Sequence, residues 1–469
     1  SEAEEFAKEI EKEAAEIAEE GKPKPEEKKA PEKESFIEKF LKMNAYVGTV
    51  TIDDNVYARW VFTPELTIGK LGLGLYLPAI FSPDVGILGF QDWQNHDEWD
   101  FRNFKDGVHD FILKFYYVSW GQWGDPLYFK IGSIDDFYLG HGFIVDNYSN
   151  MVYFPEERTL GLQFNVDAGR AGFETMVADF TRFQLMGGRF YVRPLGEDIP
   201  LAFGASAVHD RPKSEPTNID GTTSEDQLPR IFVFGSDVEL PIIALDVFSM
   251  EIFGDAAKMG YMYKELPTDL QGKIDAGALE FVKGLGTSVG LMGKIARIFR
   301  YKAAYRYILN YYEPGMVDSL WENRRLAYPD ELQDLILYQK SESFEDTTTA
   351  GIFISGGMVL FKEKLDFGLE FKSYTKISGA EETPVKKGSM YVNVAPGLVP
   401  KVYGSLSYNR TDKLEDIFQD PFDENTVLVA NISYQLAQGI ALSVDYKRTF
   451  DREDQPIDSF GISTHFSFF

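Results

Sequence analysis

Cysteine is absent from the 469-residue sequence, which excludes disulfides, thiolate metal ligands and cysteine nucleophiles. Long hydrophobic runs are absent as well. The segment LGLGLYLPAIF, residues 71–81, is among the longest, whereas a membrane-spanning helix needs about 20 apolar residues. The five histidines are scattered and form neither HxxxH nor HExxH, so the sequence predicts no metal site.

Positive charge is scarce. The sequence has 47 Lys and Arg against 74 Asp and Glu, which gives a net charge of −27 and an isoelectric point near 4.6. Phosphate backbones attract basic surfaces, so this balance argues against a nucleic-acid partner. The chain begins at Ser1 without a basic and apolar leader, and we expect that any secretion signal has been removed.

Patterns that would indicate an enzyme or a cofactor are weak. GLGTSVG, residues 284–290, contains GxG but begins a predicted strand and lacks the βαβ context of dinucleotide binding. An outer-loop hydrolase would have to combine His96 or His109 with the acidic residues at 97–100. We therefore expect no enzyme and no cofactor.

Residues 1–42 differ from the rest of the chain. Phe6, Ile10, Ala14 and Ile17 recur at helical spacing, which predicts a short amphipathic helix. The proline-containing segment GKPKPEEKKAPEK, residues 21–33, follows as an extended linker. This region is interpreted as a charged periplasmic leader that is either solvated or engages a periplasmic or cell-wall partner.

From residue 43 onward the hydrophobic period is two, which is typical of half-buried strands. TLGLQFNVD (159–167), KLDFGLEFK (364–372) and IALSVDYK (440–447) each place apolar residues on one face and polar residues on the other. About twenty such strands are predicted. The longest is the segment 286–308, which we interpret as one strand whose alternation is broken only by Arg297.

The predicted connections alternate between short and long. The short links fall at 121–126, 168–171, 195–199, 240–242, 361–364, 397–400 and 435–438. Long loops separate them, at about 81–110, 134–156, 210–229, 255–272, 308–348, 376–387 and 411–424. If short links lie on one side and long loops on the other, both ends of the strand region, residues 43–469, fall on the short-turn side.

The chain ends in FGISTHFSFF, residues 460–469, which also alternates. Phe460, Ile462, Phe466 and Phe468 share one face, and Phe469 lies one residue beyond it. Together with the strands and connections of residues 43–469, this ending resembles a bacterial outer-membrane β-barrel of the porin-like kind. The resemblance implies an all-β, transmembrane, antiparallel up-and-down barrel of about 20 strands (18–22), with long extracellular loops. It also implies that these five residues act as a signal for the barrel assembly machinery.

A barrel of this size encloses an aqueous channel, and charges on its wall set selectivity. The basic candidates for the pore lining are Arg189, Arg193, Lys294, Arg300, Lys302 and Arg306. The acidic candidates are Asp167, Glu174, Asp366, Glu370 and Asp445. The alternative interpretation is that these residues are paired, solvated wall charges.

The loop 308–348 is the predicted constriction, because it is too apolar to be left in water and begins a helix at Pro329 and Asp330. Its candidate residues are Asp318, Glu322, Asp330, Glu331 and Asp334. An outer cap is the alternative. The aromatic loop 135–157 could contact a planar solute or form a folded cap, and the acidic loops 81–110 and 412–425 could concentrate cations.

We therefore expect an outer-membrane channel for passive diffusion of small hydrophilic solutes or ions, with a periplasmic N-terminus. Its expected partners are outer-membrane lipid, the assembly machinery and a second copy of the chain. The alternative is a structural or adhesive barrel with a capped lumen.

Overall fold

The computed structural model describes residues 40–52, 55–81, 104–152, 154, 158–196, 199–211, 227–325, 327–379, 385–410, 414, 417–423, 426–450 and 455–467. The chain divides into two units, Ser1–Phe40 and Leu41–Phe469, and the second is described here. The predicted leader helix and linker lie outside the described residues, as do His96, Phe468 and Phe469.

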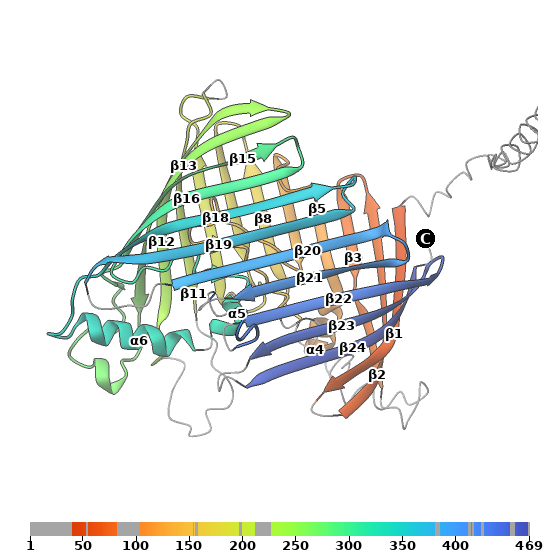
Figure 1. Ribbon diagram of the computed structural model, residues 1–469. Helices are drawn as coiled ribbons and strands as arrows, with labels where there is room; N and C mark the ends of the chain where they lie inside the picture. Colours follow the sequence, from red (N-terminus) through yellow and green to blue (C-terminus); the bar gives the residue numbers. More distant parts are fainter. Residues whose placement is uncertain are drawn as a thin grey trace, which may run out of the picture. The chain divides into compact units, whose positions relative to one another are not determined.

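The second unit is a closed antiparallel β-barrel (Figure 1). The first part of its wall consists of β1 (Leu41–Ile52), β2 (Asn55–Ile68), β3 (Leu71–Leu75), β4 (Leu77–Phe81), β5 (Phe115–Trp120), β6 (Leu127–Gly132), β8 (Gly161–Asp167), β9 (Ala171–Val177), β10 (Leu185–Val192), β11 (Ala202–Asp210) and β12 (Arg230–Leu245). The second part consists of β13 (Phe248–Met262), β14 (Glu280–Phe281), β15 (Leu285–Ile295), β16 (Phe299–Leu309), β18 (Thr348–Leu360), β19 (Leu365–Ser378), β20 (Val385–Val399), β21 (Val402–Arg410), β22 (Thr426–Ala437), β23 (Ile440–Phe450) and β24 (Pro456–Ser467). Strand β24 pairs with β1 and closes the barrel.

The described residues form 22 strands in one sheet, but two pairs of these strands each act as one wall strand. Both β3 and β4 pair with β2, and both β14 and β15 pair with β13. The barrel therefore has 20 wall strands, and the predicted fold class is confirmed. Among the described residues, no helix has the length and apolar content to cross a membrane.

Side-chain exposure alternates along the wall as the sequence predicts. On β24, Phe460 and Ile462 are 58% and 45% exposed, whereas the neighbouring Ser463 is 9% exposed. On β22, Ile432 is 61% exposed and Ser433 is fully buried against Ser443 of β23. On these strands the outward face is apolar and the inward face is polar, which is the arrangement that lipid outside and a polar interior require.

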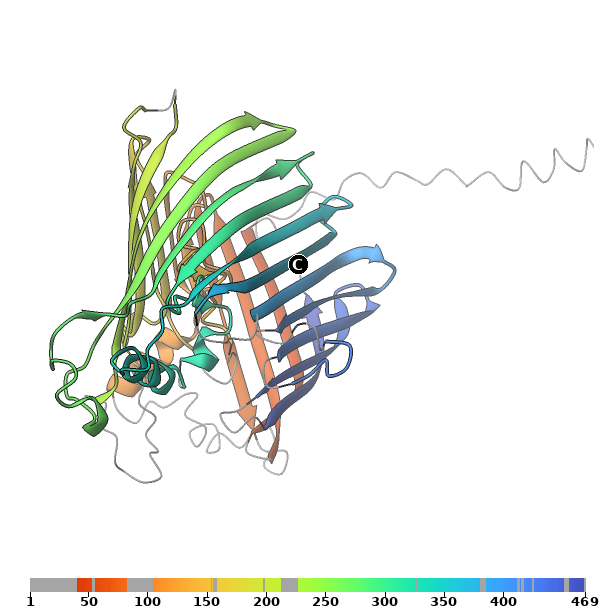
Figure 2. The same ribbon diagram turned by 60° about the vertical axis from the view of Figure 1, so that its left-hand side comes forward.

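Short and long connections alternate along most of the chain, although the β1–β2 link is as short as the β2–β3 link, so one end of the barrel carries mainly short turns and the other carries the long loops. The helices α4 (Phe104–Leu113) and α6 (Tyr328–Gln339) lie at the loop end (Figures 1 and 2). The remaining elements are η2 (Thr268–Leu270), α5 (Trp321–Arg324) and the two short strands β7 (Val145–Asp146) and β17 (Val317–Asp318).

Three predicted boundaries are wrong. The predicted long loop 255–272 starts too early, because β13 continues to Met262 and holds Asp255 in the wall. The segment 286–308 is not one strand but the hairpin β15–β16, which turns at 296–298, where Ala296 and Arg297 have φ of 53° and 61°. The inward and outward faces of this segment were nevertheless predicted correctly. Ile295 pairs with Phe299 across the turn, and paired residues point to the same face of a sheet, so the alternation of faces in β15 continues unchanged in β16. The predicted turn at 240–242 is instead a register shift within β12 between Pro241 and Ile243, and the turn lies between Leu245 and Phe248.

The left-handed conformation of residue 296 gives a test of this hairpin. A non-glycine residue with positive φ costs about 1–2 kcal/mol, and glycine does not incur that cost. We expect Ala296→Gly to stabilise the barrel by up to about 1 kcal/mol, because the entropy of the unfolded glycine offsets part of the gain. Urea unfolding in detergent measures the difference.

The control is Ala303→Gly within β16, which should destabilise the barrel by about 0.5–1 kcal/mol. Equal destabilisation by both substitutions would contradict the turn and favour one uninterrupted strand.

Candidate functional site

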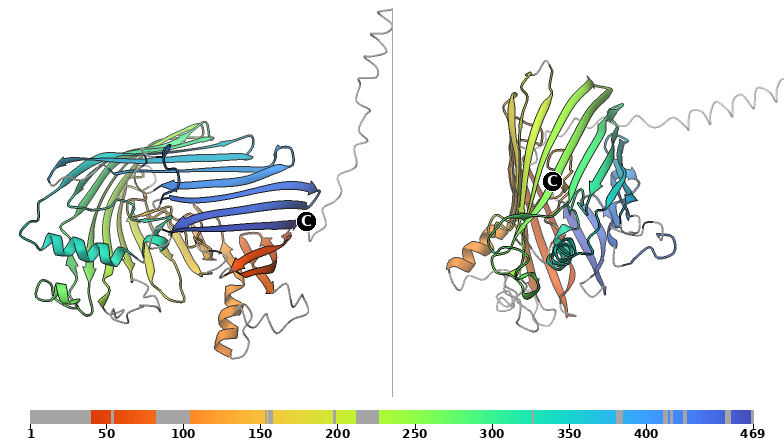
Figure 3. Two further views of the ribbon diagram at one scale, coloured as in Figure 1. Left: turned by 60° about the horizontal axis from the view of Figure 1, so that its bottom comes forward. Right: turned by 90° about the vertical axis from the view of Figure 1, so that its left-hand side faces the viewer.

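Two long loops fold into the barrel and pack against its inner wall. Residues 133–152 and 310–340, which we call the plug, contribute to one hydrophobic cluster with inward-facing residues of β9–β13 and of β16 and β19. Within the plug, β7 and β17 pair in parallel, with Val145 opposite Val317. Phe137, Tyr148 and Trp321 are completely buried. The main apolar core of this protein therefore lies inside the barrel, and Figure 3 shows these segments from two further sides.

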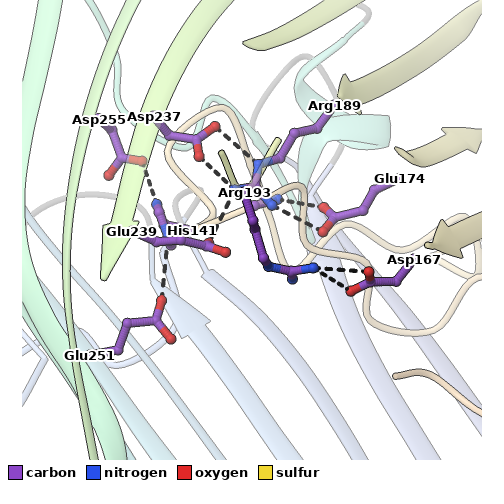
Figure 4. Close-up of polar contacts among 10 residues, drawn as sticks. His141, Asp167, Glu174, Arg189, Arg193, Asp237, Glu239, Glu251 and Asp255 are labelled. Atoms are coloured by element: carbon purple, nitrogen blue, oxygen red, sulfur yellow. Dashed lines mark hydrogen bonds and ion pairs between the residues drawn. The ribbon is translucent and has the colours of Figure 1, made fainter. Parts of the chain in front are cut away.

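The plug carries His141 to a group of carboxylates on the wall (Figure 4). His141 Nδ1 lies 2.8 Å from Asp255 Oδ1, and Nε2 lies 3.2 Å from Glu239 Oε2. The ring stacks on Phe253, with centroids 4.6 Å apart. Burial alone would lower the pKa of His141, but the hydrogen bonds to Asp255 and Glu239, together with the nearby carboxylate of Glu251, outweigh it and raise the pKa to about 11. The imidazole is therefore held as a cation among carboxylates.

Arg189 of β10 continues this network. Its guanidinium donates to Asp237 at 2.6 and 3.0 Å, to Glu239 at 3.1 Å and to Glu174 at 3.1 Å. Glu174 in turn accepts the backbone N–H of Gly140 at 3.1 Å. The arginine thereby connects three wall strands and the base of the plug.

A second network lies on the other side of the plug. Lys372 of β19 donates to Asp146 of β7 at 2.9 Å and also contacts Glu370 at 2.9 Å. Burial by itself would raise the pKa of Asp146, but the charge of Lys372, followed by those of Lys302 and Arg306, holds it below its usual value. Asp146 is 2% exposed, so this ion pair is shielded from solvent.

Glycines make the approach to Asp146 possible. Gly142 and Gly315 both have φ near 70°, and a Cβ on either would lie within 3.0 Å of an Asp146 carboxylate oxygen. The two loop chains can therefore turn tightly around this one carboxylate.

Two further carboxylates, one on the wall and one in the plug, form three ion pairs that hold the plug. Asp210, at the end of β11, accepts from Arg325 at 2.5 Å and from Trp321 Nε1 at 3.0 Å. Glu313 accepts from Arg324 at 2.8 Å and from Lys387 of β20 at 2.6 Å. Burial alone would raise the pKa of Glu313, but the charges of Arg324 and Lys387 hold it well below its usual value.

The predicted basic wall residues divide by their position along the barrel. Arg189 and Arg306 are 2% and 1% exposed beneath the plug, and Lys302 donates to the carbonyl oxygen of His141. Toward the short turns, the Arg300 side chain is 50% exposed and Lys294 is also exposed. One face of β16 carries Lys302, Arg306 and Arg300. The difference in exposure among these side chains therefore shows where the plug covers the wall and where the wall faces open space.

The remaining basic residue and the acidic candidates lie in pairs. Arg193 follows β10 and contacts both carboxylate oxygens of Asp167 at 2.9 Å. Asp366 accepts from Arg300 at 3.2 Å, and Asp445 accepts from Asn431 at 2.6 Å. Glu174 and Glu370 belong to the two networks beside the plug.

The predicted constriction residues separate into two groups. Asp318 pairs in register with Asp146 in the β7–β17 ladder, and Glu322 accepts from Tyr148 at 2.6 Å, so both lie within the plug. Asp330, Glu331 and Asp334 lie on the exposed face of α6. The apolar residues Leu332 and Ile336 hold the opposite helix face against the barrel, and the role of the three acidic residues at a constriction stays a prediction.

Sequence reasoning missed the residues that organise the site. They are His141 and Asp146 of the plug and the wall carboxylates Asp237, Glu239, Glu251 and Asp255. The segments DVE (237–239) and EIFGD (251–255) place acidic residues two and four positions apart, which puts them on one face of a strand. This spacing could have revealed the acidic group on the wall, but the turn predicted at 240–242 broke the register between β12 and β13.

The sequence GTSVG, residues 286–290, matches the GxSxG pattern of some hydrolases. It lies inside β15, whereas that pattern functions on a strand-to-helix turn. Among the described residues, Ser288 Oγ has no hydrogen-bond partner, so no base is positioned to activate it.

The closed sheet, the apolar outer face and the polar inner face decide the fold. It is that of an outer-membrane β-barrel. No protein-family model and no curated protein matches the sequence.

Solved outer-membrane barrels are similar at low identity. The outer membrane protein OpdK of Pseudomonas aeruginosa is 8% identical over 91% of this chain and 98% of its own, with a TM-score of 0.30. FpvA of P. aeruginosa is 12% identical over 91% of this chain and 72% of its own, with a TM-score of 0.37. CdiB of Acinetobacter baumannii is 6% identical over 91% of this chain, with a TM-score of 0.28, and this chain spans 60% of its length. These likenesses concern the fold alone.

The buried pair of Asp146 and Lys372 gives a test of how the plug is held. Removing one partner of a buried ion pair costs about 3–5 kcal/mol, because the other charge is left uncompensated. We expect Asp146→Ala to destabilise the plug by this amount and to make the loops 133–152 and 310–340 sensitive to protease. Limited proteolysis with mass mapping measures the effect.

Two variants control this experiment. Asp330→Ala, on the exposed face of α6, should change stability by less than about 0.5 kcal/mol. The double substitution Asp146→Leu with Lys372→Met should restore much of the resistance, since it removes both charges. Full resistance of Asp146→Ala would contradict an anchoring role.

Glu313 gives a pH test. Its pKa in the folded protein is depressed below the ordinary value of 4.5, so its stabilising contribution is complete above that value and is lost as the pH falls toward the folded pKa. Protease resistance of residues 310–340 should therefore hold from pH 7 to about 5 and decrease below about 4.5. Glu313→Gln should already be sensitive at pH 7, and equal resistance of both proteins at every pH would exclude the contribution.

Proposed function

We propose that this protein is an outer-membrane channel for passive diffusion of small hydrophilic solutes or ions, and that the plug forms its constriction. The observation that carries the proposal is the exposure gradient on β16, from Arg306 at 1% beneath the plug to the Arg300 side chain at 50% near the short turns. A charge on the inner wall that is half exposed needs water beside it, because an unsolvated charge is costly.

The wall strands β22 and β23 support the same conclusion. Their inward faces carry Asn431 and Asp445, which are polar and only partly buried and therefore suit a hydrated surface. Charged residues of both signs, such as Arg300 and Asp366, lie on the inner wall nearby. This lining favours hydrophilic solutes over apolar ones. By the resemblance to outer-membrane barrels, the short turns and the N-terminus would face the periplasm.

A specific observation favours a second candidate, the structural barrel with a capped lumen. The plug forms a continuous apolar core with the wall, and Trp321, Phe137 and Leu185 in it are fully buried. A core of this kind is stable by itself and need not open. In that case the loops would cap the lumen, and residues 1–42 would engage a periplasmic or cell-wall partner.

Conductance in a planar bilayer separates the two candidates. We expect steady single-channel current from the full chain, and a several-fold larger current when residues 312–344 are replaced by a short Gly/Ser linker. Deletion of the loop without any change in conductance would exclude it as the constriction. Silence in the full chain with current after removal of residues 1–42 would make the N-terminal segment the obstruction, and silence in every variant would support the capped barrel.

Charge selectivity tests the lining. Lys294→Glu with Arg300→Glu replaces two exposed basic charges on the inner face, so the reversal potential in a salt gradient should shift toward cation selectivity. The control is Arg297→Glu, which reverses one basic charge at the β15–β16 turn, where it pairs with Asp246, so the shifts are compared per reversed charge. Equal shifts per reversed charge would place the selectivity at the mouth and not in the lumen.

A further inference from the structure

The carboxylates around His141 have an unusual arrangement for a sheet. Asp237 of β12 lies directly opposite Asp255 of β13, and Glu239 lies diagonally between Asp255 and Glu251 on the same inward face. Like charges in such positions repel one another unless a cation lies between them. The arrangement is therefore expected to serve a purpose other than the pairing of the two strands.

Among the described residues, the basic groups in contact with these carboxylates do not balance them. Five carboxylates, those of Glu174, Asp237, Glu239, Glu251 and Asp255, meet three basic groups, which are Arg189, His141 and the Lys302 ammonium at the His141 carbonyl. Two negative charges remain even when His141 is protonated. The excess is concentrated where the arginine does not reach, beside Glu251.

One oxygen of Glu251 has no hydrogen bond to satisfy it within the part of the chain that the structure describes. This atom, Oε1, is buried and lies 3.8 Å from His141 Nε2. Glu239 Oε2 lies 3.2 Å from the same nitrogen, and the three atoms lie within 4.8 Å of one another. Ligand atoms about 2.1 Å from a tetrahedral ion are about 3.4 Å apart, which matches these separations.

The opposite side of the imidazole is fixed in the way that metal-binding histidines are fixed. Nδ1 lies 2.8 Å from Asp255, whose carboxylate accepts its proton, and Phe253 stacks on the ring. A carboxylate on one ring nitrogen orients the other toward a metal and strengthens it as a ligand. Nε2 is thereby aimed at the two glutamates.

We infer that His141, Glu239 and Glu251 form a binding site for a first-row divalent cation such as Zn²⁺, with Asp255 as the residue that orients the imidazole. One nitrogen and two carboxylate ligands suit such an ion better than Mg²⁺ or Ca²⁺, which prefer oxygen alone. The cation takes the place of the proton that the carboxylates otherwise hold on Nε2. The side chains of Glu239 and Glu251 are 17% and 24% exposed, so the site is reached from the lumen.

This site goes beyond the proposed channel function and does not depend on it. His141 belongs to the plug and both glutamates belong to the β12–β13 hairpin, so a bound cation would link the loop 133–152 to the wall. No histidine pair marks this site in the sequence, because its ligands come from three separate segments.

The test uses the full chain, folded in detergent, and measures Zn²⁺ binding by calorimetry in a background of Mg²⁺, with metal analysis after desalting. Magnesium suppresses weak, non-specific binding to this acidic protein. We expect one retained Zn²⁺ per chain, and a visible absorption band with Co²⁺ that reports a nitrogen-containing site. Glu251→Gln should weaken the affinity by about 10-fold or more, and Asp255→Asn by about 10- to 100-fold.

Glu174→Gln is the matched control, because Glu174 belongs to the same network through Arg189 but does not contact His141. It should bind Zn²⁺ as the unaltered chain does. Proteolysis verifies that each variant keeps its plug. Absence of retained Zn²⁺ in the unaltered chain would overturn the inference, as would unchanged binding in both Glu251→Gln and His141→Gln.

Discussion

Closure of the sheet is the constraint on which the rest of the structure depends. In lipid, each backbone N–H and C=O must find a partner within the protein, and a barrel provides these partners only when its last strand pairs with its first. Here Asn44–Gly48 of β1 pair with Ser463–Ser467 of β24. Once the sheet is closed, the two-residue period sends alternate side chains to lipid and to the lumen. The polar inner wall is a direct consequence of that period.

A lumen enclosed by 20 strands is too wide for wall side chains to fill. The plug fills part of it, and the charges show how it is held. The wall strands β9–β13 present mainly carboxylates, namely Glu174, Asp210, Asp237, Glu239, Glu251 and Asp255. The strands β16–β20 present mainly bases, namely Lys302, Arg306, Lys372 and Lys387. The plug lies between them and meets each with the opposite sign.

Much of this fold could be predicted from the sequence, because the signals are local. The alternation in β8, β19, β23 and β24 follows from the backbone geometry of a strand, and the ordering of short and long connections gives the strand directions. The turns were harder to predict from the sequence. The β15–β16 turn has no glycine or proline, and its left-handed residues are Ala296 and Arg297, so nothing in the local sequence marks it. Conversely, Pro241 marks a bulge and not a turn.

The site was much less predictable, for a physical reason. The faces of individual strands place Arg189, Lys302 and Arg306 toward the lumen, but their partners come from loops distant in sequence. Lys372 meets Asp146 across 226 positions, and Lys302 meets the His141 carbonyl across 161. Such pairs depend on where a loop folds back against the wall. Neither the hydrophobic period of the strands nor the amino-acid composition predicts that position. Only the apolar content of the loop 308–348 indicated burial, without indicating against which wall.

The two kinds of interaction in the plug have different roles. Apolar burial drives the loops into the lumen, but it is non-directional and would tolerate many orientations of Trp321, Phe137 and their neighbours. Buried ion pairs add little net stability, because desolvation offsets their attraction, yet a wrong pairing leaves a charge uncompensated. With acids on one wall and bases on the other, a plug rotated by half a turn would oppose like charges. The separation of charge on the wall therefore selects the one orientation in which Asp146 faces Lys372 and His141 faces Asp255.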